Sequence, residues 1–359
     1  MEAIDRNKTL VVQADCIPVK GYKRSCLYDL TRKKYYFIPN SLADILKDYN
    51  RLPINKLYRD FDNSPILDEY FKFLTEKEII YLADEWELEH FPNLGLDWKH
   101  PSKISTALIE IDETTRFDCL KLQALFDGLG IKHLQIRQVS LLWSDFITQL
   151  SSCLINSRLK SIELTLPFAN DYINIAKAFK EVNPKTLLIY FFAAYENKSI
   201  LEPKLPRIIL TKDSIESFSV EKSPNPKYFA VNIQSFTEAQ RHHTFYNRKL
   251  FINKLGQVKN SLFNAKTFGH IDLIDVAAVV GTEEFQEFWF IEKDKTAICR
   301  DCEFRYMCTD QRVPKKSGDQ WVHGIDCRYN PYLAKWAWEE GFEIASSTVT
   351  SQLHENQLN

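Results

Sequence analysis

Four cysteines lie close together near the carboxyl end of the chain, and they constrain its fold more than any other feature. Within 29 residues stand Cys299, Cys302, Cys308 and Cys327. A C-x2-C pair forms a turn that directs two thiolates to one point, and two more cysteines nearby complete a four-thiolate site. Zinc and an iron–sulfur cluster both accept four thiolates, so the spacing predicts a metal centre without choosing between them. Disulfides are the alternative, which the reducing cytoplasm disfavours.

Composition excludes several classes of protein. The chain has 359 residues, with 46 Lys+Arg against 48 Asp+Glu, and this balance gives no case for binding nucleic acid or an acidic membrane. The longest apolar run, Leu187 to Tyr195, has nine residues, too few to cross a membrane. The amino terminus (Met1 to Thr9) is charged, which is not typical of a signal peptide. We therefore expect a soluble, cytoplasmic protein.

Glycine is scarce, at ten residues in the chain, and neither GxxxxGK[ST] nor GxGxxG occurs. These motifs supply the backbone cradle for nucleotide phosphates in many enzymes. The sequence therefore gives no sign that this chain binds a nucleotide by itself.

The middle of the chain alternates apolar runs with amphipathic stretches. Predicted strands begin every 25 to 29 residues, at Ala107–Asp112, His133–Val139, Ser161–Phe168 and Thr186–Phe192. Between them lie predicted helices, at Phe117–Leu129, Leu142–Ile155 and Tyr172–Val182. This rhythm is typical of βα units in a parallel sheet, and Arg207–Leu210 and Tyr228–Ile233 would extend it to about six strands. The pattern predicts an α/β fold, which we interpret as a degenerate partial (β/α) barrel.

The first hundred residues have a different order of elements. Three short strands are predicted, at Leu10–Ala14, Ser25–Leu30 and Lys34–Ile38. Three helices follow them, at Ser41–Tyr49, Asn55–Asp60 and Ile66–Ala83. Strands followed by helices indicate a small separate domain, and an ordinary winged-helix scaffold would satisfy this pattern.

The cysteine segment resembles a SPASM domain, the carboxy-terminal extension of many radical-SAM enzymes that modify peptides. The resemblance rests on the run from Cys299 to Asp310 and on Cys327-Arg-Tyr-Asn-Pro-Tyr332. It implies that one auxiliary [4Fe-4S] cluster is ligated by Cys299, Cys302, Cys308 and Cys327. It also implies a radical-SAM type of barrel upstream.

Only half of the SPASM pattern is present. The glycine hairpin that precedes the first auxiliary cluster corresponds to Arg248–Ser261, with Gly256 in place, but Ser261 stands at the G-x4-C position. Arg312 stands at the C-x3-C position, and no cysteine lies nine to fifteen residues before Gly256. Every cysteine that would bind only the first cluster is absent, so the resemblance implies one cluster.

The triad that binds the radical-generating cluster is also missing. Radical-SAM enzymes hold that cluster with C-x3-C-x2-C, whereas the gaps between successive cysteines before Cys299 are nine, 92 and 33 residues. We therefore expect no reductive cleavage of SAM. A closed four-thiolate centre has no vacant position for a substrate and is structural or electron-carrying.

The amino-terminal arrangement resembles the PqqD-like element of ribosomal peptide maturation systems. There a precursor's leader joins the exposed sheet edge as an added strand and contacts the third helix. The resemblance implies that a peptide is bound by Lys34, Tyr35, Tyr36, Phe37, Ile38, Tyr70, Phe71 and Leu74.

As a whole, the chain resembles the SPASM-domain peptide maturases of grasp-with-spasm systems. That resemblance implies a PqqD-like domain (1–100), a degenerate radical-SAM-like βα domain (101–245) and a SPASM-like domain (246–359). It implies an accessory role in peptide maturation, with a ribosomal precursor peptide and an ATP-grasp ligase as partners. Two alternatives stay open: a redox enzyme that acts on the peptide through its one cluster, and a structural or interaction protein that is stabilised by a zinc ion bound to the cysteines. Whether this chain catalyses any reaction is not decided by the sequence.

Several other residues are candidates for a functional role. Glu110 and Asp112 alternate with apolar residues, so both should face one side of a strand. Positive charge should stabilise an anionic cluster, and arginines near the cysteines are Arg300, Arg305, Arg312 and Arg328. The roles of Cys16 and Cys26 depend on whether they lie near other thiols.

Overall fold

The computed structural model describes residues 4–345. The chain divides into two compact units. The first unit joins three stretches of sequence, which are the described residues up to Trp98, Ser223–Thr244 and the described residues from Ile291. The second unit comprises Lys99–Lys222 and Phe245–Phe290. The division into three domains stays a prediction.

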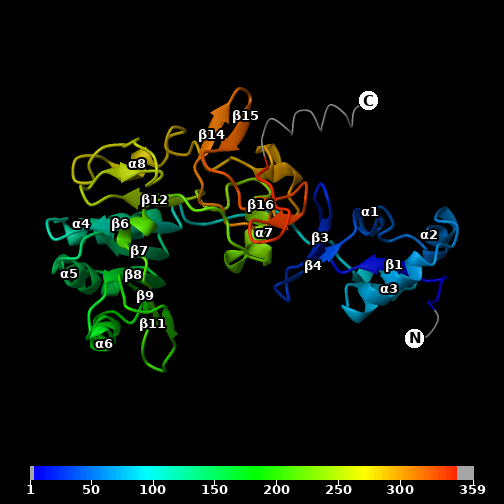
Figure 1. The fold of residues 1–359 in the computed structure, drawn as a ribbon, viewed down its shortest axis with the longest axis horizontal. Helices are drawn as coiled ribbons and strands as arrows, with labels where there is room; N and C mark the ends of the chain where they lie inside the picture. The colour runs from blue at the N-terminus through cyan, green and yellow to red at the C-terminus, as the bar shows by residue number, and fades with distance from the viewer. Residues whose placement is uncertain (1–3, 346–359) are drawn as a thin grey trace. The chain divides into compact units, whose positions relative to one another are not determined.

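The second unit is built on an eight-stranded sheet, in the order β10-β11-β9-β8-β7-β6-β12-β13 (Figure 1). Six strands are parallel: β6 (Thr106–Ile111), β7 (His133–Gln138), β8 (Ser161–Pro167), β9 (Thr186–Phe192), β11 (Arg207–Leu210) and β12 (Lys249–Ile252). The two edge strands are antiparallel to their neighbours: β10 (Lys198–Ile200) and β13 (Val258–Lys259). The predicted α/β class with a large parallel sheet is therefore confirmed. Within the described residues β10 and β13 do not pair with each other, so the sheet is open, and its interpretation as a partial barrel stays a prediction.

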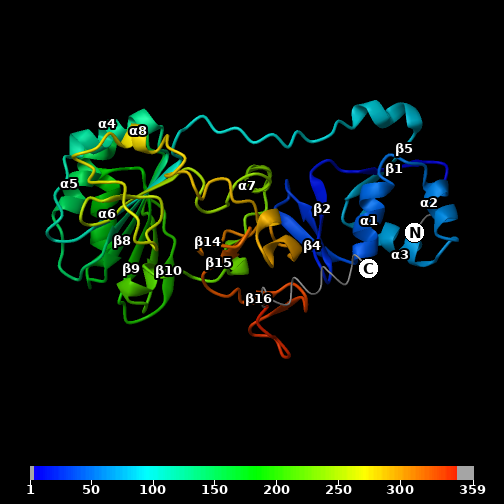
Figure 2. The same ribbon diagram turned by 90° about the horizontal axis from the view of Figure 1, so that it is seen from above.

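Helices of the second unit lie along one side of this sheet (Figures 1 and 2). They are α4 (Cys119–Leu129), α5 (Phe146–Cys153), α6 (Tyr172–Val182) and the short α8 (Val276–Val279), with a turn of 3-10 helix at Leu154–Asn156. A further turn of 3-10 helix, Ile215–Phe218, lies on the other face, where the Phe218 carbonyl accepts from Arg137 (2.8 Å). Alternate strand residues such as Ile109, Ile136 and Leu164 are fully buried in the apolar core with α4 and α5. The side chains between them, including Glu110 and Arg137, point to the opposite face, as the two-residue repeat of a strand requires.

One predicted strand of this unit is wrong. Tyr228–Ile233 was expected to extend the sheet, but it lies between a turn of 3-10 helix (Pro226–Tyr228) and α7 (Ile233–Ala239), in the first unit. The Asn225 and Asn232 side chains accept hydrogen bonds from main-chain N–H groups at the start of these helices, and such caps favour a helix over a strand. The sixth parallel strand is β12, which pairs with β6.

The first unit contains a three-stranded antiparallel sheet in the order β2-β3-β4. Its strands are β2 (Cys16–Lys20), β3 (Ser25–Asp29) and β4 (Lys34–Ile38). Three helices follow: α1 (Asn40–Asp48), α2 (Ile54–Asp60) and α3 (Ile66–Glu76). A separate two-stranded ladder pairs β1 (Thr9–Val12) with β5 (Ile80–Ala83), after which a 3-10 helix covers Glu85–His90.

Two expectations about this region need correction. The predicted first strand, Leu10–Ala14, overlaps β1, which pairs with β5, and the third member of the sheet is β2. The predicted helix Ile66–Ala83 ends at Glu76, because Glu78 has a left-handed backbone (φ 54°) that a helix cannot contain. The residues after it turn back as β5.

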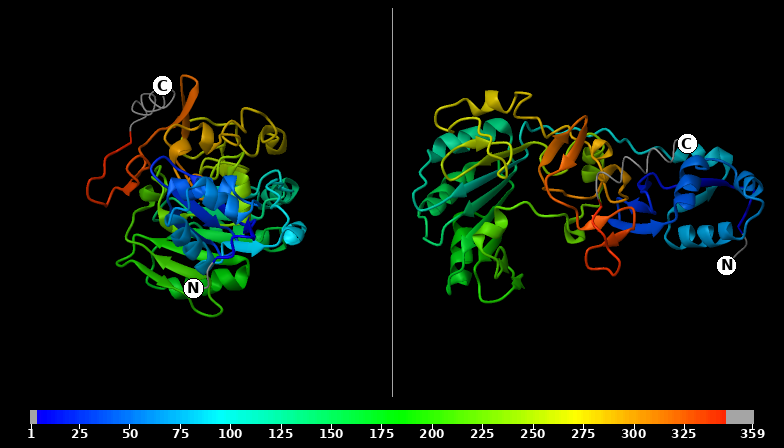
Figure 3. Two further views of the ribbon diagram at one scale, coloured as in Figure 1. Left: turned by 90° about the vertical axis from the view of Figure 1, so that its right-hand side faces the viewer. Right: turned by 45° about the horizontal axis from the view of Figure 1, so that its top comes forward.

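The cysteine segment of the first unit consists of short elements. It has turns of 3-10 helix at Lys293–Lys295 and Cys299–Asp301 and an antiparallel hairpin, orange in Figure 3, of β14 (Pro314–Ser317) and β15 (Gln320–His323). A second small ladder pairs β16 (Tyr329–Asn330) with β17 (Lys335–Trp336). Side chains of this segment, including Phe304, Met307 and Tyr329, share one apolar cluster with Cys26 and Tyr28 of β3.

Candidate metal centre and peptide-binding edge

The structure brings the four clustered cysteines to the wall of one cavity. Cys299 and Cys308 are buried and Cys302 and Cys327 are half-buried. The main-chain N–H of Cys302 donates to the Cys299 carbonyl (3.0 Å), which closes the turn of the C-x2-C pair. Cys308 donates likewise to the Phe304 carbonyl (3.0 Å). The spacing of the cysteines predicts that they lie close together, and their role as metal ligands stays a prediction.

The distances between the sulfur atoms bear on which metal group would fit. Within residues 4–345 no three of these thiols lie within 4.8 Å of one another. A tetrahedral zinc site with bonds of about 2.3 Å would hold its sulfurs about 3.8 Å apart. In a [4Fe-4S] cubane each thiolate belongs to a different iron, so the four sulfurs stand farther apart around a larger core. A separation beyond 4.8 Å is not in itself a match to either group, so the choice between zinc and an iron–sulfur cluster stays a prediction.

Buried charged residues adjoin the thiols. The Lys293 ammonium lies 3.7 Å from the Cys308 sulfur, and the Arg312 guanidinium lies 3.9 Å from the Cys299 sulfur. Both cations bind the carboxylate of Asp310, at 3.0 Å for Lys293 and 2.6 Å for Arg312. All three side chains are almost completely buried.

This triad carries one more positive than negative charge, and a surplus buried charge is unfavourable unless an opposite charge lies nearby. Burial raises the pKa of the Cys308 thiol to about 12, while Lys293 acts in the opposite direction. A bound metal deprotonates its thiols outright, and four thiolates around zinc or a [4Fe-4S] core are anionic. The surplus positive charge therefore fits an anionic metal centre bound to these cysteines.

His323 lies beside the same network. Donor atoms of Cys299, Asp310 and His323 all lie within 4.8 Å of one another, which is a spacing that metal ligands can have. Asp310, however, already accepts hydrogen bonds from Lys293 and Arg312, and two cations next to it oppose a third. Burial lowers the pKa of His323 to about 3, so its ring is neutral. We interpret these residues as the ion network around the cysteine centre.

Sequence reasoning identified only some of the charged residues around the cysteines. Of the four predicted arginines, Arg312 reaches a cysteine sulfur, whereas Arg305 also lines the cavity but binds Asp294 (2.8 Å). Arg300 pairs with Asp301 (3.8 Å) and Arg328 is exposed. Lys293, Asp310 and His323 were missed, because no motif relates them to the cysteines. The only available signal was the position of Asp310 two residues after Cys308.

The residues at the positions where the SPASM resemblance would place ligands of a first cluster have other roles. The Ser261 side chain is buried and lies 3.4 Å from the Tyr246 hydroxyl, and it accepts from the Phe263 N–H (3.1 Å). The predicted hairpin at Arg248–Ser261 is present as β12 and β13. Its turn contains Gly256 with φ +73°, where a side chain would meet the His270 ring.

Strand β4 is an edge of the three-stranded sheet, and within the described residues no strand pairs with its outer side. The Leu30 N–H donates to the Asp15 carbonyl, so the main-chain groups of even-numbered residues in β3 form hydrogen bonds with β2. The main-chain groups of the odd-numbered residues point the other way and form hydrogen bonds with β4. In the observed register the bonded residues of β4 are then Lys34, Tyr36 and Ile38. The main-chain groups of Tyr35 and Phe37 consequently point outward, available to an added strand.

The other predicted peptide contacts lie on α3, and the structure separates them. Tyr70 is half-buried and its hydroxyl lies 3.0 Å from the Ser41 hydroxyl. Phe71 and Leu74 are 3% and 2% exposed in the helical core, so they support the helix from inside. Phe73, which sequence reasoning missed, packs edge-on against Tyr36 at 5.9 Å between ring centroids.

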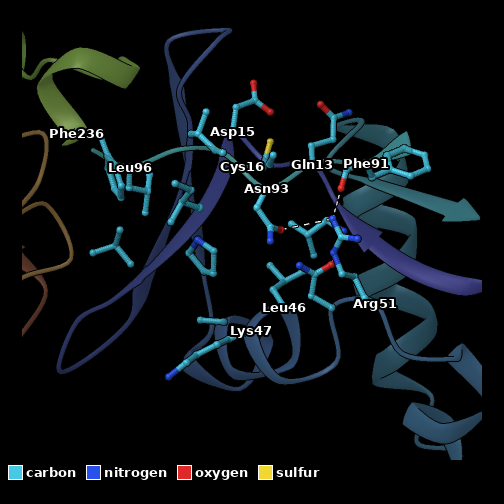
Figure 4. A pocket seen from close by; sticks show the side chains of 18 of the residues that line it. Gln13, Asp15, Cys16, Leu46, Lys47, Arg51, Phe91, Asn93, Leu96 and Phe236 are labelled. Carbon is cyan, nitrogen blue, oxygen red and sulfur yellow. Dashed lines mark hydrogen bonds between the residues drawn. The ribbon is translucent and has the colours of Figure 1, made fainter. Parts of the chain in front are cut away.

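The opposite edge, β2, is a poor template for strand addition. Its outward residues include Pro18, which has no N–H, and Lys20, whose carbonyl accepts from the Arg305 guanidinium (2.7 Å). A cavity of about 880 Å³ lies along this edge (Figure 4). Cys16 lines it, whereas Cys26 is buried in another apolar cluster, so these two thiols do not form a pair.

The sheet face that carries the side chains of Tyr35 and Phe37 is in direct contact with the cysteine segment. The ring centroids of Tyr35 and Phe37 lie 6.0 and 5.7 Å from that of Phe304, which is two residues after Cys302. The Tyr28 hydroxyl donates to the Glu303 carbonyl (2.8 Å). At Gly21 a β-carbon would lie 2.8 Å from the Glu303 nitrogen, so only glycine permits this approach. The cysteine segment thus forms part of the support of β4.

Glu110 and Asp112 are in different environments. Asp112 accepts hydrogen bonds from Thr114 and Thr115 in the loop after β6 and pairs with Lys254 (3.2 Å). Burial raises the pKa of Glu110, and neighbouring Arg137 opposes this effect. Neither residue adjoins a second carboxylate in a way that indicates acid–base catalysis.

Comparisons with known proteins give only a distant likeness. No family model matches the chain, and no curated protein matches it. Crystal structures of SuiB from Streptococcus suis align with 83% of this chain and 94% of that chain. The TM-scores are 0.35 for SuiB bound to S-adenosylmethionine (11% identity), 0.38 for SuiB bound to precursor peptide SuiA (10%) and 0.34 for a third SuiB structure (10%). No helix among the described residues has the length and apolarity needed to span a bilayer.

Proposed function

We propose that this chain is an accessory protein of ribosomal peptide maturation. It binds the leader of a precursor peptide along β4 and presents the peptide to a partner ATP-grasp ligase. It carries one closed [4Fe-4S] cluster on Cys299, Cys302, Cys308 and Cys327. The observation that carries this proposal is the outer edge of β4, with which no strand among the described residues pairs. The sheet face that carries Tyr35 and Phe37 packs against the cysteine segment.

Each part of the proposal has a physical support. Unpaired main-chain groups of Tyr35 and Phe37 give affinity for an extended peptide, and neighbouring side chains give selectivity. The cysteine cavity with its surplus positive charge favours an anionic cluster, which when bound supplies a cross-link and a site for one electron. The grasp-with-spasm assignment and the ATP-grasp partner rest on the sequence resemblance.

Metal analysis tests the cluster. Anaerobically purified protein should contain about four irons and four sulfides and absorb broadly near ~400 nm, and Cys302→Ala should lose both. Cys153→Ala is the control, because Cys153 belongs to the other unit. About one zinc without colour would instead support the alternative of a structural protein stabilised by zinc.

Peptide binding tests the role of β4. The probe is any short peptide found to be encoded near the gene for this chain, and the readout is amide hydrogen exchange at Tyr35 and Phe37. Phe37→Pro removes one outward N–H without removing a bond to β3, so it should weaken binding about three- to tenfold. Lys20→Pro, which removes an outward N–H from the opposite edge, should leave affinity unchanged.

A pull-down with any ATP-grasp ligase found to be encoded near the gene for this chain tests presentation. The complex should strengthen when the peptide is present. Modification of the peptide by this chain without the ligase would contradict the accessory role.

A further inference from the structure

An apolar row on α3 runs beside β4 and is only partly covered. Ile66, Tyr70, Phe73 and Lys77 recur at helical spacing, so they share one face of the helix. This face is distinct from the core face of Leu67, Phe71 and Leu74. Ile66 is 40% exposed, and Tyr70 and Phe73 are partly buried against the helical core.

The row has a fixed direction along β4. Lys77 lies over the Tyr36 ring (5.8 Å from ammonium to centroid), Phe73 contacts the same ring, and Tyr70 reaches Ser41, just beyond the end of β4. The start of β4 therefore lies near the end of α3. We call Lys34, Tyr36, Ile66, Tyr70, Phe73 and Lys77 the β4–α3 surface.

This surface is basic at one end and apolar at the other. Lys34 shares a strand face with Tyr36, so its stem lies on the same side as Lys77. Within the part of the chain that the structure describes, neither lysine has an ion-pair partner. The neighbouring Arg32, in contrast, is already paired with Asp29 and Glu78. At the other end Tyr70 and Ile66 offer no charge.

A strand added to β4 would place every second side chain over this surface. The residue beside Lys34 would lie near the ammonium groups of Lys34 and Lys77. The next two residues on that face would meet Tyr36 and Phe73, and then Tyr70. Opposite charge and apolar contact favour a matching order of side chains in the peptide.

We infer that the β4–α3 surface selects an extended peptide whose residues facing α3 run from acidic to apolar, at every second position. The acidic side chain pairs with Lys34 and Lys77, and the apolar ones cover Phe73 and Tyr70. This inference rests on the proposed function, since it specifies the peptide that β4 binds.

Fluorescein-labelled synthetic peptides test the inference. Because an added strand can run either way, two orders are used: Thr-Glu-Thr-Leu-Thr-Val-Thr and Thr-Val-Thr-Leu-Thr-Glu-Thr. Each is paired with a version that has Lys in place of Glu. One of the two Glu peptides should bind about two- to tenfold more tightly than its Lys version, as two exposed ion pairs allow, and less tightly as salt rises.

Charge reversal on the protein provides the matched control. Lys34→Glu/Lys77→Glu should invert the preference, so that the Lys peptide binds better. Lys72→Glu/Lys47→Glu changes the net charge equally at exposed sites outside the β4–α3 surface and should preserve the preference. Circular dichroism verifies that both variants are folded.

The readouts separate this inference from the proposed function. Protection of the Tyr35 and Phe37 amides by Glu and Lys peptides alike, with equal affinities, would overturn the selectivity and leave strand addition standing. If none of the four peptides protects these amides, strand addition at β4 is wrong and the proposed function fails with it.

Discussion

At the scale of single residues, the main result is that cations rather than further ligands surround the cysteines. Asp310 holds Lys293 and Arg312 in place, and each of these cations faces one sulfur. Arg312 stands where the SPASM pattern has a cysteine of the first cluster. Arg312 thus contributes positive charge beside the Cys299 sulfur.

Replacing Lys293 should weaken the metal centre. Lys293→Met removes a buried positive charge beside the thiolates, so the midpoint potential should become more negative and a chelator should remove the metal faster. Lys293→Arg should restore both properties. Lys295→Met changes net charge equally at an exposed site that pairs with Glu292, and it is the control. Equal effects of the two Met variants would contradict a specific role for Lys293.

Asp112 predicts a pH dependence of stability. Burial acts to raise the pKa of Asp112, but hydrogen bonds from Thr114, Thr115 and Lys254 together lower it to about 2. A carboxyl with a lowered pKa stabilises the fold above its unfolded pKa of about 3.9 and loses that contribution as pH falls toward 2. Asp112→Asn should therefore cost about 1–2 kcal/mol at neutral pH and less near pH 2, measured by urea unfolding. An equal cost at both pH values would refute this account.

At the scale of elements, the β12–β13 hairpin depends on one glycine. Gly256→Ala introduces a side chain into a left-handed turn and against the His270 ring, which should cost about 1–3 kcal/mol. Gly128→Ala is the contrast in the same unit, since no atom beyond its chain neighbours and the α4 backbone lies within 4 Å of its added β-carbon, and alanine favours the helix α4 by about 0.5–1 kcal/mol. Urea unfolding, with hydrogen exchange to identify the second unit, should show opposite signs for the two variants.

Elements with a strong local period could be predicted from the sequence, and elements that depend on distant partners could not. The βα repeat predicts β6 to β9 and the helices between them, because apolar residues recur at fixed intervals within each element. β2 was missed because Pro18 reads as a break, although an edge strand tolerates it. β5 was read as helix because its partner β1 lies about 70 residues earlier. Similarly, the cysteines converge as their spacing predicts, whereas Lys293 and His323 reach the site only through folding.

At the scale of the whole molecule, sequence order and compact units differ. The cysteine segment belongs to the same unit as the amino-terminal sheet, although the large parallel sheet separates them in sequence. Phe304, Met307 and Tyr329 complete the apolar cluster beneath β3. We therefore expect a metal bound by this segment to stabilise the surface that we propose binds the peptide, so that the binding free energies at the two sites are linked.

Removal of the metal should loosen the peptide edge and spare the parallel sheet. In Cys302→Ala, amide exchange should accelerate in β3 and β4, because the loop carrying Glu303 and Phe304 loses its anchor, and peptide affinity should fall with it. Exchange in β6 to β9 should not change, since these strands have their own core. Cys119→Ala, in the second unit, controls for loss of a thiol. Reciprocally, bound peptide should slow release of the metal to a chelator. Normal exchange in β4 after metal loss would show that the two sites are independent.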